Sequence, residues 1–228
     1  MSEIPKHPEK SAGDIAQGVV KAAVSGLPVV GGPAAELLGM VFGPPLEKRR
    51  DKWMDDLAGI VKELQSKVEG LTPEKLSQDH AFVTMSMRAT EIAIRTHQQE
   101  KLDALRNAVL NAGLKIDLDE NIQQIFLNYI DALTPSHLKV LKVFRNPQAW
   151  AHANGITFPN WTAGSPATVL ETALPEMAGR RDCYDQLVSD LQQRGLMTRV
   201  DIHTTMTGHG MLQSRTTGLG NDFLGFIS

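Results

Sequence analysis

The sequence predicts a mainly α-helical protein: a helical bundle around one long helix, followed by a winged-helix-like α+β part with a β-hairpin. Three observations predict this fold class. The centre of the chain is an uninterrupted amphipathic stretch, residues 81–112. Glycine and proline residues divide the sequence before it into short helical segments. The last third begins with helical patterns and continues with β-like ones.

The central stretch is typical of one continuous helix. It contains neither glycine nor proline, and its apolar residues, from Phe82 to Ala112, recur at steps of three and four. That spacing places an apolar stripe along one side of a helix. With a rise of about 1.5 Å per residue, the stretch would form a rod of roughly 48 Å. We expect the other helices to pack along it, because a compact domain does not need a rod of this length.

The first 131 residues are predicted to form a disordered tail, residues 1–12, and a helical bundle, residues 13–131. The tail is polar and holds two prolines. An apolar hairpin of two short helices would follow, because Pro28, Pro33 and the Gly-Pro-Pro sequence at residues 43–45 each break a helix. The bundle helices are expected at residues 13–26, 34–42, 45–68, 81–112 and 117–131. Thr72 is expected to be an N-cap, and Gly113 is expected to end the long helix.

The remaining residues, 134–228, are predicted to form the winged-helix-like part. Three helices would precede two strands, with a turn at residues 208–210 between the strands. Helix, helix, helix and hairpin is the order of elements in a winged helix. The expected elements are helices at residues 134–144, 166–177 and 181–194 and strands at residues 198–205 and 212–217.

Composition and charge narrow the class of protein. Residues 1–132 hold 15 basic and 19 acidic residues and residues 133–228 hold 8 and 7, so neither part has the basic surplus of a high-affinity nucleic-acid-binding domain. Cys183 is the single cysteine, which rules out an internal disulfide and fits a reducing, cytoplasmic compartment. No cleaved signal peptide is predicted, because Asp14 and Lys21 interrupt the start of the first apolar run.

Residues suited to catalysis or metal binding are few. The sequence has no glycine-rich phosphate-binding loop. His203 and His209 lie close together in sequence but have no third ligand nearby. A lone cysteine such as Cys183 is more often a small apolar core residue than a nucleophile. We therefore predict no catalytic residue, no metal site, no cofactor and no small-molecule substrate.

DNA binding is the alternative function. In that interpretation Arg180, Arg181, Arg199 and Arg215 contact phosphates, and the helix at residues 181–194 lies in the major groove. The exposed side of that helix is acidic, however, and its carboxylates would repel phosphates. An interface for a protein partner or a second copy of the chain is therefore favoured. The residues expected on the exposed side are Asp182, Asp185, Gln186, Ser189, Asp190 and Gln193.

The apolar segment at residues 22–46 is the second candidate for function. Between Lys21 and Glu47 the only charged residue is Glu36. Prolines and glycines prevent a single spanning helix, which needs about 20 unbroken apolar residues. The favoured interpretation is a hairpin buried against the long helix; the other is a membrane-active hairpin, with basic residues 48–52 at the lipid head groups. The apolar residues concerned are Val24, Leu27, Val29, Val30, Leu37, Leu38, Met40, Val41 and Phe42.

Residues 44–53, 97–112 and 123–147, together with the ending at residues 194–196 and 217–224, are similar to a group of uncharacterised bacterial helical proteins. The layout also resembles, more distantly, the abortive-infection alpha family of phage-defence proteins. That family places a glycine-rich apolar N-terminus before a helical bundle and ends in a winged-helix-like segment closing with Thr-x-x-Gly-x-x-Phe. In this chain the closing pattern is Thr217, Gly220 and Phe223. The shared motifs are packing signatures, so the resemblance implies no active-site residue.

These inferences combine into one predicted function. The resemblance implies a cytoplasmic bacterial protein of the phage-defence or abortive-infection type. The residues favour a non-enzymatic protein that acts through contacts with a protein partner or with copies of itself. Its N-terminal hairpin would be either part of the core or a segment that associates with a membrane on activation. The alternative is a winged-helix DNA-binding transcriptional regulator.

Overall fold

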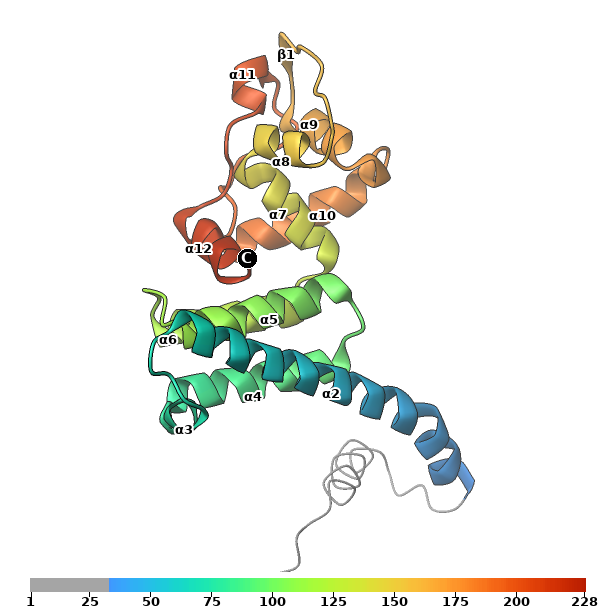
Figure 1. The fold of residues 1–228 in the computed structure, drawn as a ribbon. Coiled ribbons are helices and arrows are strands. Elements are labelled where there is room, and N and C mark those ends of the chain that lie inside the picture. The colour runs from blue at the N-terminus through green and yellow to red at the C-terminus, as the bar shows by residue number, and fades with distance from the viewer. Residues whose placement is uncertain (1–32) are drawn as a thin grey trace, which may run out of the picture.

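The computed structural model describes the backbone of residues 33–228 and the side chains of residues 39–228. Within this part the chain is mainly helical, with one small antiparallel sheet (Figure 1), which confirms the predicted class. The first helices are α2 (Pro33–Lys67), α3 (Pro73–Gln78), α4 (His80–Arg95), α5 (Gln99–Gly113) and α6 (Glu120–Ala132). They are followed by α7 (Pro135–Arg145), α8 (Pro147–Ala153), β1 (Ala163–Gly164), α9 (Pro166–Ala173), η1 (Pro175–Met177), α10 (Arg181–Gln193), β2 (Met206–Thr207), α11 (Gly208–Met211) and α12 (Gly218–Phe226).

The predicted continuous helix at residues 81–112 is wrong: the stretch forms two helices, α4 and α5, which pack against each other. α4 ends at Arg95, and the backbone of Thr96 is extended. The Thr96 hydroxyl accepts a hydrogen bond from the backbone N–H of Gln98 at 3.2 Å, which offers the chain an alternative to the helical pattern. Folding back allows both halves of the apolar stripe to bury against each other.

The longest helix is instead α2, which runs without a break from Pro33 to Lys67. The helix ends predicted around residues 43–45 are therefore wrong. Pro44 and Pro45 lie inside α2, and both are exposed. Each removes one backbone hydrogen bond, and at an exposed position water can hydrate the carbonyl group left without its partner. The predicted tail, the helix at residues 13–26 and the start of the apolar hairpin lie outside the described residues.

Two predicted boundaries in the bundle, at Thr72 and at Gly113, are confirmed. The Thr72 hydroxyl caps α3 by accepting a hydrogen bond from the N–H of Lys75 at 3.3 Å. Gly113 is the last residue of α5; a Cβ atom there would lie 2.5 Å from Leu64 Cδ1, so α2 and α5 approach closely at this glycine. The Asp79 carboxylate caps α4 by accepting from the N–H of Phe82 at 3.1 Å, and this hydrogen bond lowers the pKa of Asp79.

The predicted hairpin of strands at residues 198–205 and 212–217 is also wrong. Met197, which directly precedes the first segment, forms an isolated bridge with Thr216 of the second, and β2 pairs with β1 instead. The carbonyl groups of the first segment have other donors: the Gln192 side chain donates to the carbonyls of Thr198 and Val200, at 3.0 and 2.9 Å. The N–H of Ala167, at the start of α9, donates to the Ile202 carbonyl.

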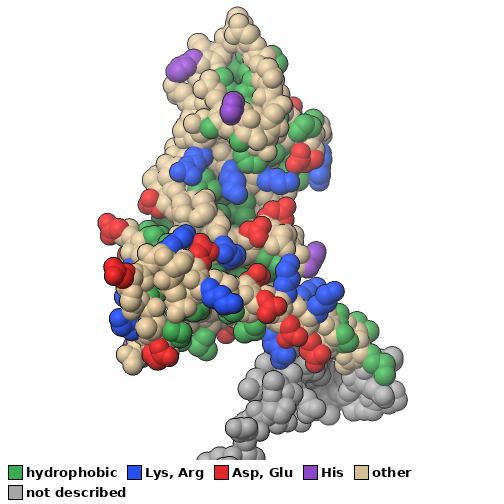
Figure 2. Space-filling view, viewed as in Figure 1, with side chains coloured by type: hydrophobic (Ala, Val, Ile, Leu, Met, Phe, Trp, Pro, Cys, Tyr) green, Lys and Arg blue, Asp and Glu red, His purple; other side chains and the backbone are tan. Residues whose placement is uncertain are grey.

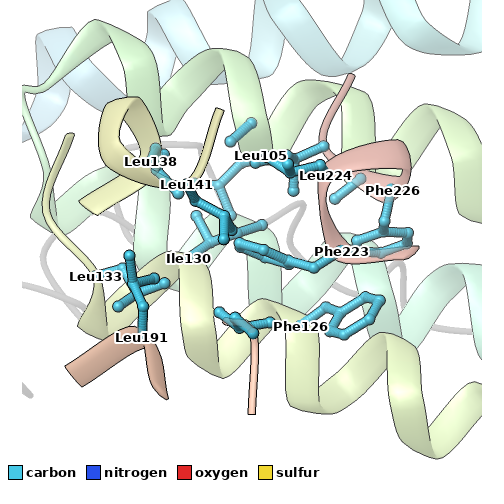
Figure 3. Packing of buried hydrophobic residues seen from close by; sticks show 14 of the residues in the cluster. Leu105, Phe126, Ile130, Leu133, Leu138, Leu141, Leu191, Phe223, Leu224 and Phe226 are labelled. Atoms are coloured by element: carbon cyan, nitrogen blue, oxygen red, sulfur yellow. The ribbon is translucent and has the colours of Figure 1, made fainter. Parts of the chain in front are cut away.

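The C-terminal helix α12 joins the two parts of the molecule. It packs against α5, α6 and α7 (Figure 1), and Phe223 and Phe226 meet Phe126 of α6 in one buried aromatic cluster (Figure 3). The Thr217 hydroxyl caps α12 by accepting from the N–H of Gly220 at 3.0 Å. The closing motif Thr-x-x-Gly-x-x-Phe thus docks the last helix, and buried residues form one continuous core from α2 to α12.

Candidate interaction site

The N-terminal part of α2 extends away from the rest of the molecule and carries exposed apolar side chains (Figures 1 and 2). Met40, Val41 and Phe42 are 64%, 61% and 54% exposed. Large apolar side chains that are exposed one at a time are ordinary, whereas three in succession form a patch. We call residues 39–46 the α2 arm.

The α2 arm contains part of the apolar segment identified in the sequence. Val24, Leu27, Val29 and Val30 lie outside the described residues, and Leu37 and Leu38 belong to α2 without described side chains. At the three remaining positions, residues 40–42, the structure contradicts the buried-hairpin interpretation.

The exposed side chains do not lie on one face of the helix. Successive residues of an α-helix are rotated by about 100°, so three in a row cover about 200° of its circumference. No charged residue lies between Glu36 and Glu47, and the arm is therefore apolar on most of its sides. A helix that is apolar all round is typical of immersion in an apolar medium, whereas an interface helix has one apolar stripe.

A groove of about 260 Å³ lies directly beside the α2 arm, between α2 and the junction of α4 with α5. Its floor contains the buried residues Trp53 and Ala93. Trp53 is held in place by a hydrogen bond from its indole N–H to the Thr90 hydroxyl at 2.9 Å. The other lining residues are Pro45, Lys48, Arg49, Lys52, Asp56, Thr96, His97, Gln99 and Leu102. We call this cavity the α2 groove.

Charges are segregated around α2 at the level of the groove. Glu47, Asp51 and Asp55 are spaced i,i+4, are all exposed and do not line the groove. Lys48, Arg49 and Lys52 do line it, with Asp56 as the one acidic lining residue. Lys52 donates a hydrogen bond to the Gln99 side chain at 3.0 Å across the groove. The segment as a whole is nearly neutral, but its groove side is cationic.

Sequence reasoning missed the groove because it treated residues 81–112 as one rod. Thr96, His97 and Gln99 line the cavity where that rod is interrupted. The signal was a β-branched threonine followed by three polar residues at positions 97–99, which interrupts the apolar stripe. The basic residues at 48–52 were identified, but the sequence did not show which of them would point to one site.

The four arginines of the DNA-binding alternative do not form one surface. Arg180, Arg181 and Arg199 are exposed, and Arg181 forms an ion pair with Asp185 at 3.4 Å. Arg215 is only 7% exposed, which contradicts its predicted phosphate contact. Its guanidinium donates to the Gly210 carbonyl at 2.8 Å, and burial lowers its pKa. Arg215 therefore holds the loop around α11 inside the fold.

Two aspartates predicted to face solvent on α10 are paired with histidines. Asp185 contacts His203 Nε2 at 2.7 Å, and Asp190 contacts His137 Nε2 at 3.2 Å. The second histidine is buried and also contacts the Thr134 hydroxyl at 2.8 Å through Nδ1. These pairs fasten α10 to its neighbours, a structural role that the spacing of the acidic residues did not reveal.

Two kinds of site are absent from the described residues. No helix among them combines the length and the apolar character that a membrane-crossing segment requires. The described side chains also include no cluster of three or more His, Cys, Asp or Glu residues suited to a metal ion.

Neither models of known protein families, nor curated protein sequences, nor solved structures match this chain. The resemblance to the abortive-infection alpha family stays a prediction. Function must be inferred from the side chains themselves.

Proposed function

We propose that the protein is a non-enzymatic binding protein that attaches to a membrane surface through the α2 arm. The observation that carries this proposal is the exposure of Met40, Val41 and Phe42, on a helix that extends beyond the body of the molecule. Burying the exposed part of these side chains in lipid would contribute roughly 3–5 kcal/mol. That contribution gives weak, reversible attachment, comparable to that of a single acyl chain.

A membrane explains the distribution of the apolar side chains better than a protein groove does. A helix that docks in a groove presents residues at i, i+3, i+4 and i+7 along one face. The α2 arm is apolar over about 200° of its circumference. Lipid surrounds an inserted helix on every side, so it can cover all of these side chains together.

The biological setting follows from the resemblance. We propose that the protein acts in bacterial antiviral defence and that membrane attachment is conditional, the protein otherwise residing in the cytoplasm. The C-terminal part supplies contacts to a protein partner or a second copy of the chain. This role is supported by Asp185 and Asp190, which pair with histidines of the same fold and thereby hold α10 in place as a rigid surface element.

Co-sedimentation of the full-length protein with vesicles of mixed phosphatidylcholine and phosphatidylglycerol tests the proposal. The double variant V41D/F42D should bind at least about tenfold more weakly than the unaltered protein, because each carboxylate opposes entry into lipid. The matched control is Met87→Asp, which alters an exposed apolar residue on α4 that is 63% exposed. This control should bind like the unaltered protein.

The proposal fails if the unaltered protein does not bind vesicles or if V41D/F42D binds them equally well. Sedimentation velocity of the same proteins identifies the competing explanation. If the unaltered protein self-associates but does not bind vesicles, and V41D/F42D does not self-associate, the α2 arm forms contacts between copies of the chain.

The winged-helix description of residues 134–228 is likewise a proposal. It is supported by the succession of α9, η1 and α10, followed by the bridge between Met197 and Thr216. DNA binding gains no support from the arginines, because Arg215 is buried and Arg181 is paired with Asp185. We therefore propose a protein-contact role for this part.

A further inference from the structure

We propose that the α2 groove binds the phosphate group of an anionic lipid. The inference rests on the proposed membrane attachment and names the lipid chemistry that this attachment recognises. It is carried by the groove itself, a cavity of about 260 Å³ lined by Lys48, Arg49 and Lys52. This volume lies just below the range of pockets for drug-sized ligands, so it suits a head group rather than a larger molecule.

The three cations of the groove have no acidic partner within salt-bridge distance among the described side chains. By contrast, Arg50, which does not line the groove, pairs with Asp51 at 3.1 Å. Lys48 and Lys52 are spaced i,i+4, an arrangement in which like charges repel. A phosphate oxygen placed between them would replace this repulsion with attraction.

The floor and walls of the groove suit a phosphate ester rather than a bare ion. Pro45, which is exposed, and Leu102, which is half-buried, provide apolar surface for the carbon atoms of the ester. The cations at the rim provide hydrogen-bond donors for the oxygens. Asp56 is acidic and also lines the groove. It provides an acceptor for the hydroxyl groups that a glycerol head group carries.

The position of the groove along α2 matches the layering of a bilayer. Phe42 and Arg49 are seven residues apart, which corresponds to roughly 10 Å along a helix. A bilayer has an interfacial layer of roughly 5–8 Å on each side of its hydrocarbon core. With the α2 arm in the edge of the core, the groove therefore lies among the head groups. Stable attachment generally takes two weak signals, and the groove would supply the second.

The test compares vesicles of pure phosphatidylcholine with vesicles that also contain phosphatidylglycerol, using the full-length protein. The groove variant is K48Q/R49Q, chosen because neither side chain has a hydrogen-bond partner within the described part of the fold. The control is R50Q/K62Q, which removes two positive charges from α2 outside the groove. A basic residue near an anionic surface increases the affinity about fivefold. The groove variant lacks two such residues, so its affinity for phosphatidylglycerol vesicles should be about 25-fold lower.

The outcomes separate this inference from the proposed function. Phosphate binding in the groove is supported if K48Q/R49Q loses the preference for phosphatidylglycerol vesicles while R50Q/K62Q keeps it. K48Q/R49Q should still bind phosphatidylcholine vesicles. Equal losses in both variants overturn phosphate binding in the groove and indicate general charge attraction, while membrane attachment stands. Absence of any vesicle binding by the unaltered protein overturns the membrane proposal. Calorimetry with glycerol 3-phosphate tests whether the groove binds a free phosphate ester. If the unaltered protein binds glycerol 3-phosphate but not vesicles, and K48Q/R49Q does not bind glycerol 3-phosphate, the ligand is a free phosphate ester and the lipid is overturned as its source.

Discussion

Replacing Phe126 with alanine is expected to lower the free energy of unfolding by about 4 kcal/mol. The Phe126 side chain is fully buried, and its ring lies 5.2 Å from that of Phe223 and 5.6 Å from that of Phe226. Those two residues belong to α12 and Phe126 to α6, so the cluster joins the end of the chain to the bundle (Figure 3). Urea denaturation followed by circular dichroism measures the loss.

The neighbouring residue provides the control for this prediction. Ile125 precedes Phe126 on α6 but is 37% exposed. Ile125→Ala should therefore cost less than about 1 kcal/mol, because much of its side chain is already in water. Similar small losses in both variants would contradict the role of the aromatic cluster in joining α12 to α6.

Gly220→Ala is expected to destabilise the protein by about 3 kcal/mol, at the upper end for one added methyl group in a packed site. A Cβ atom at this position would overlap the carbonyl oxygen of Leu196 and lie 3.0 Å from the carbonyl carbon. That obstacle is backbone, which cannot rotate aside as a flexible side chain can. The helix would have to move away from Leu196, breaking the hydrogen bond that Thr217 Oγ1 donates to the Gly195 carbonyl.

A second glycine in the same helix is predicted to respond with the opposite sign. Gly225 also belongs to α12, but apart from its chain neighbours and the backbone of its own helix no heavy atom lies within 4 Å of the position of an added Cβ. Gly225→Ala should raise the free energy of unfolding by about 0.5–1 kcal/mol, because alanine loses less conformational freedom than glycine in a helix. Thermal denaturation of both variants measures the difference. Equal shifts in melting temperature would show that Gly220 is not a close-contact position.

Local patterns in the sequence identified most helices because their signals lie within one turn. Thr72 at the start of α3 and Gly113 at the end of α5 occupy the positions predicted for them. The motif of Thr217, Gly220 and Phe223 was also correctly interpreted as a packing signature. Its three residues cap α12, permit a close approach and fill the aromatic cluster.

The predictions that failed depended on contacts between distant residues. The apolar stripe at residues 81–112 is the same whether it packs as one rod or as the hairpin of α4 and α5. Likewise, residues 198–202 look like a strand, but their carbonyl groups accept from Gln192 and Ala167 instead of from a neighbouring strand. Because these donors belong to α10 and α9 and not to a neighbouring strand, they leave no periodic signal in the sequence.

The candidate site was predictable in part. The apolar character of residues 40–42 and the basic residues nearby are visible in the sequence, and both contribute to the proposed attachment. The groove was not visible, because it exists only where the break at Thr96 faces Arg49 and Trp53 of α2. For Arg215 the sequence suggested a surface contact that the structure does not allow, because a sequence alone does not show that this charge is buried.

The most direct test of membrane attachment is the environment of the α2 arm itself. Cys183 is the single cysteine of the chain, so a Cys183→Ser background allows one polarity-sensitive fluorophore to be attached at Met40→Cys. The control position is Ile125→Cys, on α6. With phosphatidylglycerol-containing vesicles, we predict a strong blue shift and quenching by lipid-borne quenchers for the label at residue 40, and neither for the label at residue 125. An unchanged spectrum at residue 40 in the presence of vesicles would contradict insertion of the α2 arm.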